Sequence, residues 1–390
     1  MLKVNAHLHT PYSFSAFRDI DEALDRAVAE EVKVLGINDF YTAEGYHEWA
    51  EGCKKRQLYP LFGIELISLN EADRKAGIRV NDPANPGRTY LTGKGMSYPF
   101  RLAEPYASRL ASVRNESNRQ VEAMCAKLND HLRHKGVNII LDVEQIKKEL
   151  SKGSLRERHL ARALRMAVYA LCENDESAVI SVLETLFDGK KVKSSVEDIA
   201  GMENEIRANL LKAGGVAFVP EDTKAFLPMQ EVCEIILAGG GIPTYPFLAD
   251  DARGEYTEFE NDLERVAEQL TERGIHSVEF ITPRNEVHLL EKYAAYLYDL
   301  GFVVTFGSEH NTPAMEPIEL FARNRTPLTD RLKQINYDGA CVIAAHQHVV
   351  AQGLDGYVNG NGKADRSRRE EFMMWGDTLI KNGCGVNGEK

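Results

Sequence analysis

The sequence has few cysteines and no long apolar run, and both absences narrow the class of protein. Six cysteines are scattered over 390 residues without a Cys-x-x-Cys pair, which argues against a disulfide framework and favours reduced, mostly buried thiols. No apolar run approaches the length of a membrane span. The first residues, Met1-Leu2-Lys3, carry no signal-peptide pattern. We therefore expect a cytoplasmic protein with no membrane partner.

Positive charge is also scarce. Lysine and arginine number 47 against 59 acidic residues, and the formal net charge is −12. A protein that coats nucleic acid relies on excess positive charge, so bulk nucleic-acid binding is not expected. A small anion held by a few local arginines stays possible, and the charge balance leaves the oligomeric state open. The hydrophobic content of 43% is that of an ordinary globular protein.

Two catalytic motifs are missing as well: there is no Gly-x-Ser-x-Gly nucleophile elbow and no Walker-type phosphate loop. What the chain has instead is His7-Leu8-His9, directly after a short strand predicted over residues 2–6. Residues i and i+2 of a strand point the same way, so both imidazoles can bind one ion. Imidazole suits zinc, iron and manganese.

Strands and helices alternate at both ends of the sequence, which is typical of a parallel sheet or barrel. Strands are predicted at 34–37 and 61–64, and they lead to Asp39 and Glu65. The alternation resumes at residue 228, with further strands at 242–245, 277–280 and 302–306, the last leading to Glu309. Acids and histidines thus follow the strands, and active sites of such folds lie at the carboxyl ends of the strands.

The alternation stops between residues 70 and 226, where helices dominate. This region opens with a Gly- and Pro-rich stretch, Gly77 to Phe100, that is predicted to be a long loop. Six strands are visible and the interruption can hide one more. We therefore predict an α/β barrel of about seven strands, built from residues 1–69 and 227–390, with a helical insertion over residues 70–226.

Six short motifs in order resemble the PHP (polymerase and histidinol phosphatase) family. The segments that carry the resemblance are His7-Leu8-His9-Thr10-Pro11-Tyr12-Ser13, Gly36-Ile37-Asn38-Asp39-Phe40, Phe62-Gly63-Ile64-Glu65, Leu155-Arg156-Glu157-Arg158-His159-Leu160-Ala161-Arg162-Ala163-Leu164, the pair Gly214-Gly215-Val216-Ala217-Phe218-Val219-Pro220 and Ala238-Gly239-Gly240-Gly241-Ile242-Pro243, and Gly307-Ser308-Glu309. The fourth is similar to the Arg-Pro-His-x-Ala-Arg-Ala-Leu motif of the branch that acts on nucleotides and short oligonucleotides.

The resemblance implies a distorted (β/α)7 TIM-like barrel that holds divalent metal ions and hydrolyses phosphate esters. Carried over by position, His7, His9 and Glu309 would bind the first ion, Glu65 would bridge to a second, and His159 would bind the second. The implied cofactors are two divalent ions, zinc, manganese or iron, and the implied partner is a small phosphorylated substrate.

Four positions depart from the family pattern. Phe14, Phe40 and Asn311 stand where the family has ligands of a third ion, and two aromatic rings and an amide cannot hold it. We therefore expect at most two ions. Tyr245 replaces a histidine ligand of the second ion, and a tyrosinate ligand would need a metal beside it to ionise. His310, one residue from the usual position, is a further candidate ligand.

Other candidates have two interpretations each. Asp39 can orient a metal ligand or cap the following helix. Arg79, Arg88 and Lys94 lie in the Gly- and Pro-rich stretch, where they can bind a substrate anion or remain solvated. Further candidates for anion binding are Arg158 and Arg284.

Two functions are therefore weighed. The first is a metal-dependent phosphoesterase that acts through activated water, with no protein nucleophile. The alternative is a degenerate PHP domain that binds metal or ligand without turnover, because the third site is lost. A weaker third interpretation is an enzyme of the related amidohydrolase barrels, whose mid-chain lysine or histidine and closing aspartate cannot be placed here.

Overall fold

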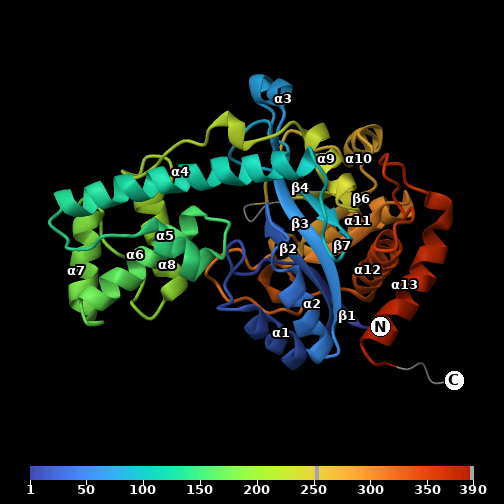
Figure 1. The fold of residues 1–390 in the computed structure, drawn as a ribbon, viewed down its shortest axis with the longest axis horizontal. Helices are drawn as coiled ribbons and strands as arrows, with labels where there is room; N and C mark the ends of the chain where they lie inside the picture. The colour runs from blue at the N-terminus through green and yellow to red at the C-terminus, as the bar shows by residue number, and fades with distance from the viewer. Residues whose placement is uncertain (251–253, 387–390) are drawn as a thin grey trace.

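A seven-stranded sheet forms the centre of the molecule in the computed structural model, which describes residues 1–250 and 254–386 (Figure 1). Its strands follow one another in chain order: β1 (Lys3–Leu8), β2 (Val32–Phe40), β3 (Tyr59–Leu69), β4 (Arg88–Lys94), β5 (Ile242–Phe247), β6 (Ser277–Ile281) and β7 (Val303–Gly307). Neighbouring strands are parallel, except that β4 runs antiparallel to β3 and β5.

The sheet curls into a nearly closed barrel. A parallel bridge joins Leu8, at the end of β1, to Glu309, which follows β7. The Glu309 backbone N–H donates to the His7 carbonyl at 3.0 Å, and the His9 N–H donates to the Glu309 carbonyl at 2.7 Å. The predicted seven-stranded, distorted TIM-like α/β barrel is confirmed, and its closure lies directly beside the two histidines.

One strand was not predicted: residues 88–94 form β4, so the prediction of a continuous loop from Gly77 to Phe100 is wrong there. Seven register pairs join β4 to β3, from Gly63 with Lys94 to Leu69 with Arg88. The strand is short and carries Thr, Gly and Lys on positions that are buried in the barrel, so composition does not mark it. β4 thus belongs to the barrel sheet although it lies inside the predicted 70–226 insertion, and the domain division itself stays a prediction.

Helices cover the outside of the barrel and close one of its ends. The covering helices are α1 (Ile20–Ala29), α2 (Tyr46–Lys55), α9 (Met229–Ala238), α10 (Leu263–Glu272), α11 (Val287–Asp299), α12 (Asp330–Val350) and α13 (Arg369–Gly383). Helix α12 lies across the amino ends of the strands, because Asn336 donates to the Val4 carbonyl at 3.1 Å and Gln347 to the Pro60 carbonyl at 2.8 Å. The carboxyl ends of the parallel strands therefore lie away from α12.

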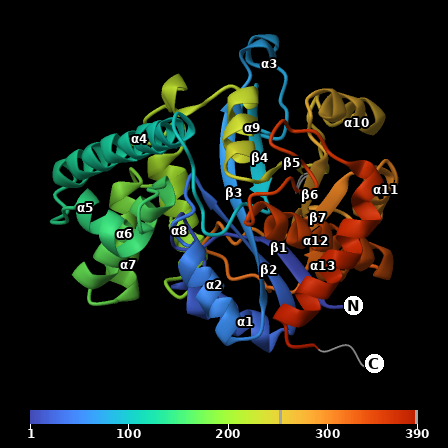
Figure 2. The same cartoon turned by 45° about the vertical axis from the view of Figure 1, so that its right-hand side comes forward.

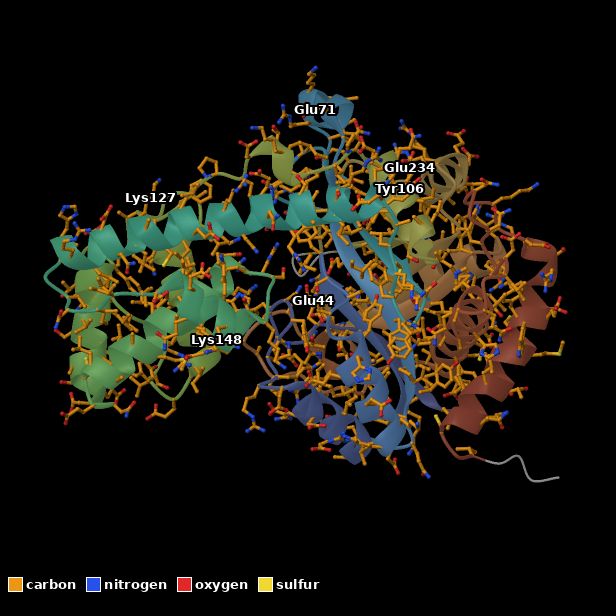
Figure 3. The ribbon with its side chains drawn as sticks, viewed as in Figure 1. Glu44, Glu71, Tyr106, Lys127, Lys148 and Glu234 are labelled. Atoms are coloured by element: carbon orange, nitrogen blue, oxygen red, sulfur yellow. The ribbon has the colours of Figure 1, made fainter. Side chains whose placement is uncertain are left out.

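A separate helical unit stands beside the barrel (Figures 1 and 2). It contains α4 (Tyr106–His134), α5 (Val143–Ile146), α6 (Glu157–Leu171), α7 (Glu176–Leu186), α8 (Ile199–Ile206) and a π-helical turn at Arg207–Leu211. These helices bury their own apolar core, which includes Leu128, Leu164 and Leu183. The long helix α4 also reaches the barrel, where Arg114 pairs with Glu44, labelled in Figure 3.

Small elements complete the described part of the chain. They are α3 (Glu71–Ala76) and the two-residue strands β8 (Phe321–Ala322) and β9 (Thr326–Pro327). A second π-helical turn lies at Lys147–Ser151, and 3-10 turns lie at Thr223–Ala225, Thr282–Arg284, Arg323–Arg325 and Arg366–Arg368. No helix in residues 1–250 and 254–386 combines the length and the apolar character that a membrane crossing needs.

Candidate metal centre

Three predicted ligands meet at the barrel mouth. The Nε2 atoms of His7 and His9 lie 3.2 Å apart. The Glu65 Oε2 atom lies 2.9 Å from His9 Nε2 and 3.6 Å from His7 Nε2, and all three side chains are at most 4% exposed. His7 and His9 come from the end of β1, and Glu65 comes from β3. These three residues can offer one ligand atom each to a single ion.

The outer nitrogen of His7 is fixed by Glu279 of β6. The two groups are 3.0 Å apart, and a carboxylate accepts, so His7 Nδ1 carries the hydrogen. Glu279 is fully buried and also accepts from the Thr92 hydroxyl at 2.6 Å and pairs with Lys94 at 2.7 Å. Burial opposes ionisation of Glu279, but Lys94 and His7 hold its pKa far below the usual value. A histidine anchored in this way presents Nε2 as the ligand atom.

His9 is oriented through a serine. Its Nδ1 lies 3.1 Å from the Ser13 hydroxyl, which donates its own hydrogen to Asp39 at 2.6 Å. His9 Nδ1 must then be the donor to Ser13, which again leaves Nε2 as the ligand atom. Asp39 also accepts from the backbone N–H and the hydroxyl of Thr10. Of the two interpretations of Asp39, these contacts match the orientation of a metal ligand.

The donor set fits a divalent ion. With both Nδ1 atoms protonated, two Nε2 lone pairs and the Glu65 carboxylate converge on one point. Glu65 Oε2 is buried and has no hydrogen-bond partner within the described residues. A positive charge at this point removes the repulsion among these groups: a metal ion can supply it, and in the absence of an ion a proton on His7 Nε2 supplies it. Burial alone would lower the pKa of His7, but Glu279 raises it to about 9, and the two histidines lower the pKa of Glu65 to about 2 despite its burial.

His159 and Glu309 do not join the three ligands. His159 Nδ1 accepts the Arg156 backbone N–H at 2.9 Å, and burial lowers the pKa of His159 to about 3. The proton of the neutral ring therefore sits on Nε2. The Glu309 carboxylate forms an ion pair with Arg284. The expected assignments of these two residues to the metal ions remain predictions.

His310 and Tyr245 also have other partners. The His310 ring nitrogens contact the Ser308 hydroxyl at 2.9 Å and the Glu316 carbonyl at 2.8 Å. The Tyr245 hydroxyl donates to the buried Glu260 at 2.7 Å. Burial raises the pKa of Tyr245 well above its usual value, which makes a tyrosinate ligand costly. Neither side chain is brought to the three ligands.

The basic residues predicted in the loop have acidic partners. Arg79 pairs with Glu258, and Arg88 pairs with Glu221. Lys94 is buried on β4, where it supports Glu279 rather than facing solvent. None of the three basic side chains lines the cavity beside the metal ligands in the described part of the structure.

That cavity has a volume of about 420 Å³ and opens beside Glu65. The barrel contributes Phe14, Phe40 and Asn311, the three residues at which the resemblance implied ligands of a third ion. The helical unit contributes Arg156, Arg158 and Arg207, and a further arginine, Arg284, follows β6. A volume of this size suits a small-molecule substrate.

Sequence reasoning missed Glu279. Its only signal was an acid inside an otherwise apolar strand, Ser277-Val278-Glu279-Phe280. A buried carboxylate needs a charged or hydrogen-bonding partner, and that requirement was the clue to a second layer around the metal ligands.

Comparison with known proteins confirms the resemblance given by the motifs. The model of the PHP domain matches residues 5–141. That range contains the three converging ligands, while it leaves most of the chain outside the match. None of the curated proteins compared with the chain matches it.

Two solved structures share the fold. One is a proposed metal-dependent phosphoesterase from Bifidobacterium adolescentis, with a TM-score of 0.56, 14% identity, and coverage of 86% of this chain and 95% of that one. The other is an amidohydrolase from Chromobacterium violaceum with bound sulfate and no metal, with a TM-score of 0.52, 17% identity, and coverage of 86% and 96%. At these identities the likeness establishes the barrel fold alone.

Proposed function

We propose that this protein is a metal-dependent phosphoesterase that acts on a small phosphorylated molecule or nucleotide. The observation that carries the proposal is the convergence of His7, His9 and Glu65 on one point, with both imidazole tautomers fixed from behind. The PHP match over these residues and the fold neighbours agree with hydrolysis aided by a divalent ion.

Each residue has a defined task in this proposal. His7, His9 and Glu65 hold the ion, which would act as a Lewis acid toward the phosphoryl group and toward water. Glu279 and the Ser13–Asp39 pair keep the two Nδ1 hydrogens in place, so the ligand atoms need no rearrangement when the ion binds. Phe40 stacks on the His9 ring at 4.9 Å and keeps bulk water from that face.

The first prediction tests the ligands. His9→Ala and Glu65→Ala should each lose bound metal and lower the hydrolysis rate by at least about a hundredfold, since a catalytic ion held by three side chains needs them all. The fold should persist, because the barrel core is apolar. Metal content per chain, circular dichroism and rates on phosphate monoesters and diesters are the measurements.

A matched control is available in His134→Ala, an exposed histidine on α4. It should keep both metal and activity. Full activity and unchanged metal content in Glu65→Ala would place the reaction elsewhere in the molecule.

A second candidate function is a non-catalytic PHP domain. It is favoured by one observation: Glu309 and His159, the remaining expected ligands, are held by Arg284 and by the α6 N-terminus. Measurement of metal content and hydrolysis rates distinguishes the enzyme from the non-catalytic domain. Wild-type protein that binds metal tightly, yet hydrolyses no ester above the rate of the free ion, is the non-catalytic domain.

A further inference from the structure

The cavity beside the metal ligands contains four arginines that differ in their partners. Arg284 is paired with Glu309, and Arg207 is paired with Glu157 at 2.7 Å. The cavity also contains Asp82, which accepts from Ala84 and Asn85 and lies 3.7 Å from Arg88. Arg284 and Arg207 thus have carboxylate partners, and the other two arginines of the cavity are Arg156 and Arg158.

Neither Arg156 nor Arg158 has a carboxylate within 4 Å in the part of the chain that the structure describes. The closest polar side-chain contact of Arg158 is the Asn204 amide oxygen at 3.4 Å. Both residues begin helix α6 and both line the cavity. Two adjacent cations repel each other, and an anion that joins them removes that repulsion. Glu157 acts favourably on both guanidinium groups through its charge, but it lies beyond ion-pair distance from them.

Each guanidinium group lies near an aromatic ring, and Phe14 also contacts Arg162, at 4.4 Å. Arg156 lies over Phe40 at 4.4 Å, and Arg158 lies over Phe14 at 5.8 Å. Such contacts fix the direction of a guanidinium without neutralising its charge. Burial, together with Arg207, lowers the pKa of Arg158 to about 10, so Arg158 remains charged at neutral pH in an environment that disfavours the charge.

The two rings are also those that replace ligands of a third ion. Phe40 contacts the His9 ring as well as the Arg156 guanidinium, so a single side chain separates the metal ligands from the arginines. The family motif does not supply these arginines: aligned on His159, it has arginine at Glu157 and proline at Arg158.

We propose that Arg156 and Arg158 form a binding site for a phosphate group beside the metal centre, and supply there the positive charge that a further metal ion would otherwise supply. Guanidinium groups match the oxygens of phosphate through paired, charge-assisted hydrogen bonds. The role in turnover rests on the proposed function, but the binding of the anion does not, because the two arginines are fixed by protein contacts alone.

Binding of inorganic phosphate to chelator-treated protein tests the site without any metal or activity. Calorimetric titration of the wild type should show saturable binding of one phosphate. The double variant Arg156→Met and Arg158→Met should weaken it at least about tenfold, a loss of about 1.4 kcal/mol or more. Arg119→Met, an exposed arginine on α4 paired with Glu116, should leave it unchanged.

Further measurements distinguish failure of the phosphate-site proposal from failure of the metal-site proposal. His9→Ala should keep phosphate binding although it loses metal, so a failed metal proposal leaves this one standing. Equal affinity of the double variant and the wild type would overturn the site, whatever the activity. Acetate bound as tightly as phosphate, through the same two arginines, would overturn the assignment of the ligand as phosphate. Circular dichroism of the double variant checks that α6 is still folded.

Discussion

At the scale of the residue, the side chains that hydrogen-bond to the ligand histidines determine which imidazole nitrogens can bind the ion. His7 and His9 are ordinary imidazoles until Glu279 and Ser13 fix which nitrogen carries the hydrogen. Glu279 in turn depends on Lys94, whose pKa is lowered by burial although the carboxylate opposes that shift. Lys94, Glu279 and His7 form a chain of contacts from β4 through β6 to β1, so a change at its far end reaches the metal ligand.

Glu279→Gln tests that chain of contacts. The amide keeps the size of the side chain, removes the charge that Lys94 and His7 face, and should weaken metal binding by about 10- to 100-fold, as for other groups that orient a ligand. Calorimetric titration with zinc or manganese measures it. Glu71→Gln, an exposed acid on α3 (Figure 3), is the control. Unchanged affinity in Glu279→Gln would mean that Glu279 only stabilises the barrel.

At the scale of the element, the closure between β1 and β7 constrains the site most directly. Gly307 ends β7, and a Cβ atom placed there would lie 2.2 Å from the His7 Cβ. No side chain fits in that space. Because glycine has no side chain, β7 can approach β1 closely at position 307. The backbone hydrogen bonds of Glu309 to His7 and His9 depend on the same approach.

Gly307→Ala should therefore displace His7. We expect metal affinity to fall at least about tenfold and the free energy of unfolding to fall by about 1–3 kcal/mol, the usual cost of overpacking. Gly360→Ala, where an added Cβ meets no atom within 4 Å, should change neither quantity. Metal titration and urea unfolding are the measurements. If both alanine variants behave alike, the strand closure does not position His7.

The elements also show what the sequence could and could not predict. His7 and His9 were predictable because they come at the end of the buried strand β1, where a polar side chain needs a polar or charged partner. Glu65 was predicted to end a strand at 61–64, but β3 continues to Leu69, so Glu65 lies inside the strand. Glu279 was not predictable, since its partners Thr92 and Lys94 come from β4, a strand hidden in a segment that resembles a loop. The motif marked His159, but a hydrogen bond from Arg156 at the start of α6 decides where its proton lies.

At the scale of the whole molecule, the cavity lies where two separately packed units meet. The barrel mouth supplies Glu65 and Phe40, and the helical unit supplies Arg156 and Arg158. Each unit has its own apolar core. The metal ligands belong to the barrel alone, whereas the proposed phosphate site uses the helical unit, so metal and anion should stabilise different parts of the protein.

The stability of the whole protein should depend on acid pH through buried histidines. Burial lowers the pKa of His159 to about 3, and those of His310 and His346 to about 4. Each ring is neutral in the folded state at pH values where the unfolded chain, with a pKa near about 6.5, takes up a proton. Their contribution to stability is therefore complete above about pH 6.5 and is lost as the pH falls toward the folded-state pKa values.

His7 does not offset this loss. Its raised pKa of about 9 favours folding fully below about pH 6.5 and less as the pH rises through 9, so below 6.5 its contribution is constant. For chelator-treated protein, each of the three histidines should lower the free energy of unfolding by up to about 1.4 kcal/mol per pH unit between about pH 6.5 and pH 4. Glu260 offsets about the share of one histidine, because burial raises its pKa to about 7 and the folded protein keeps a proton that the unfolded chain loses above about pH 4.3. Urea unfolding across that range measures the slope. His346→Gln, at the barrel end closed by α12, should reduce the slope by the share of one proton. Equal slopes in the wild type and the variant would show that the His346 ring is not neutral in the folded protein.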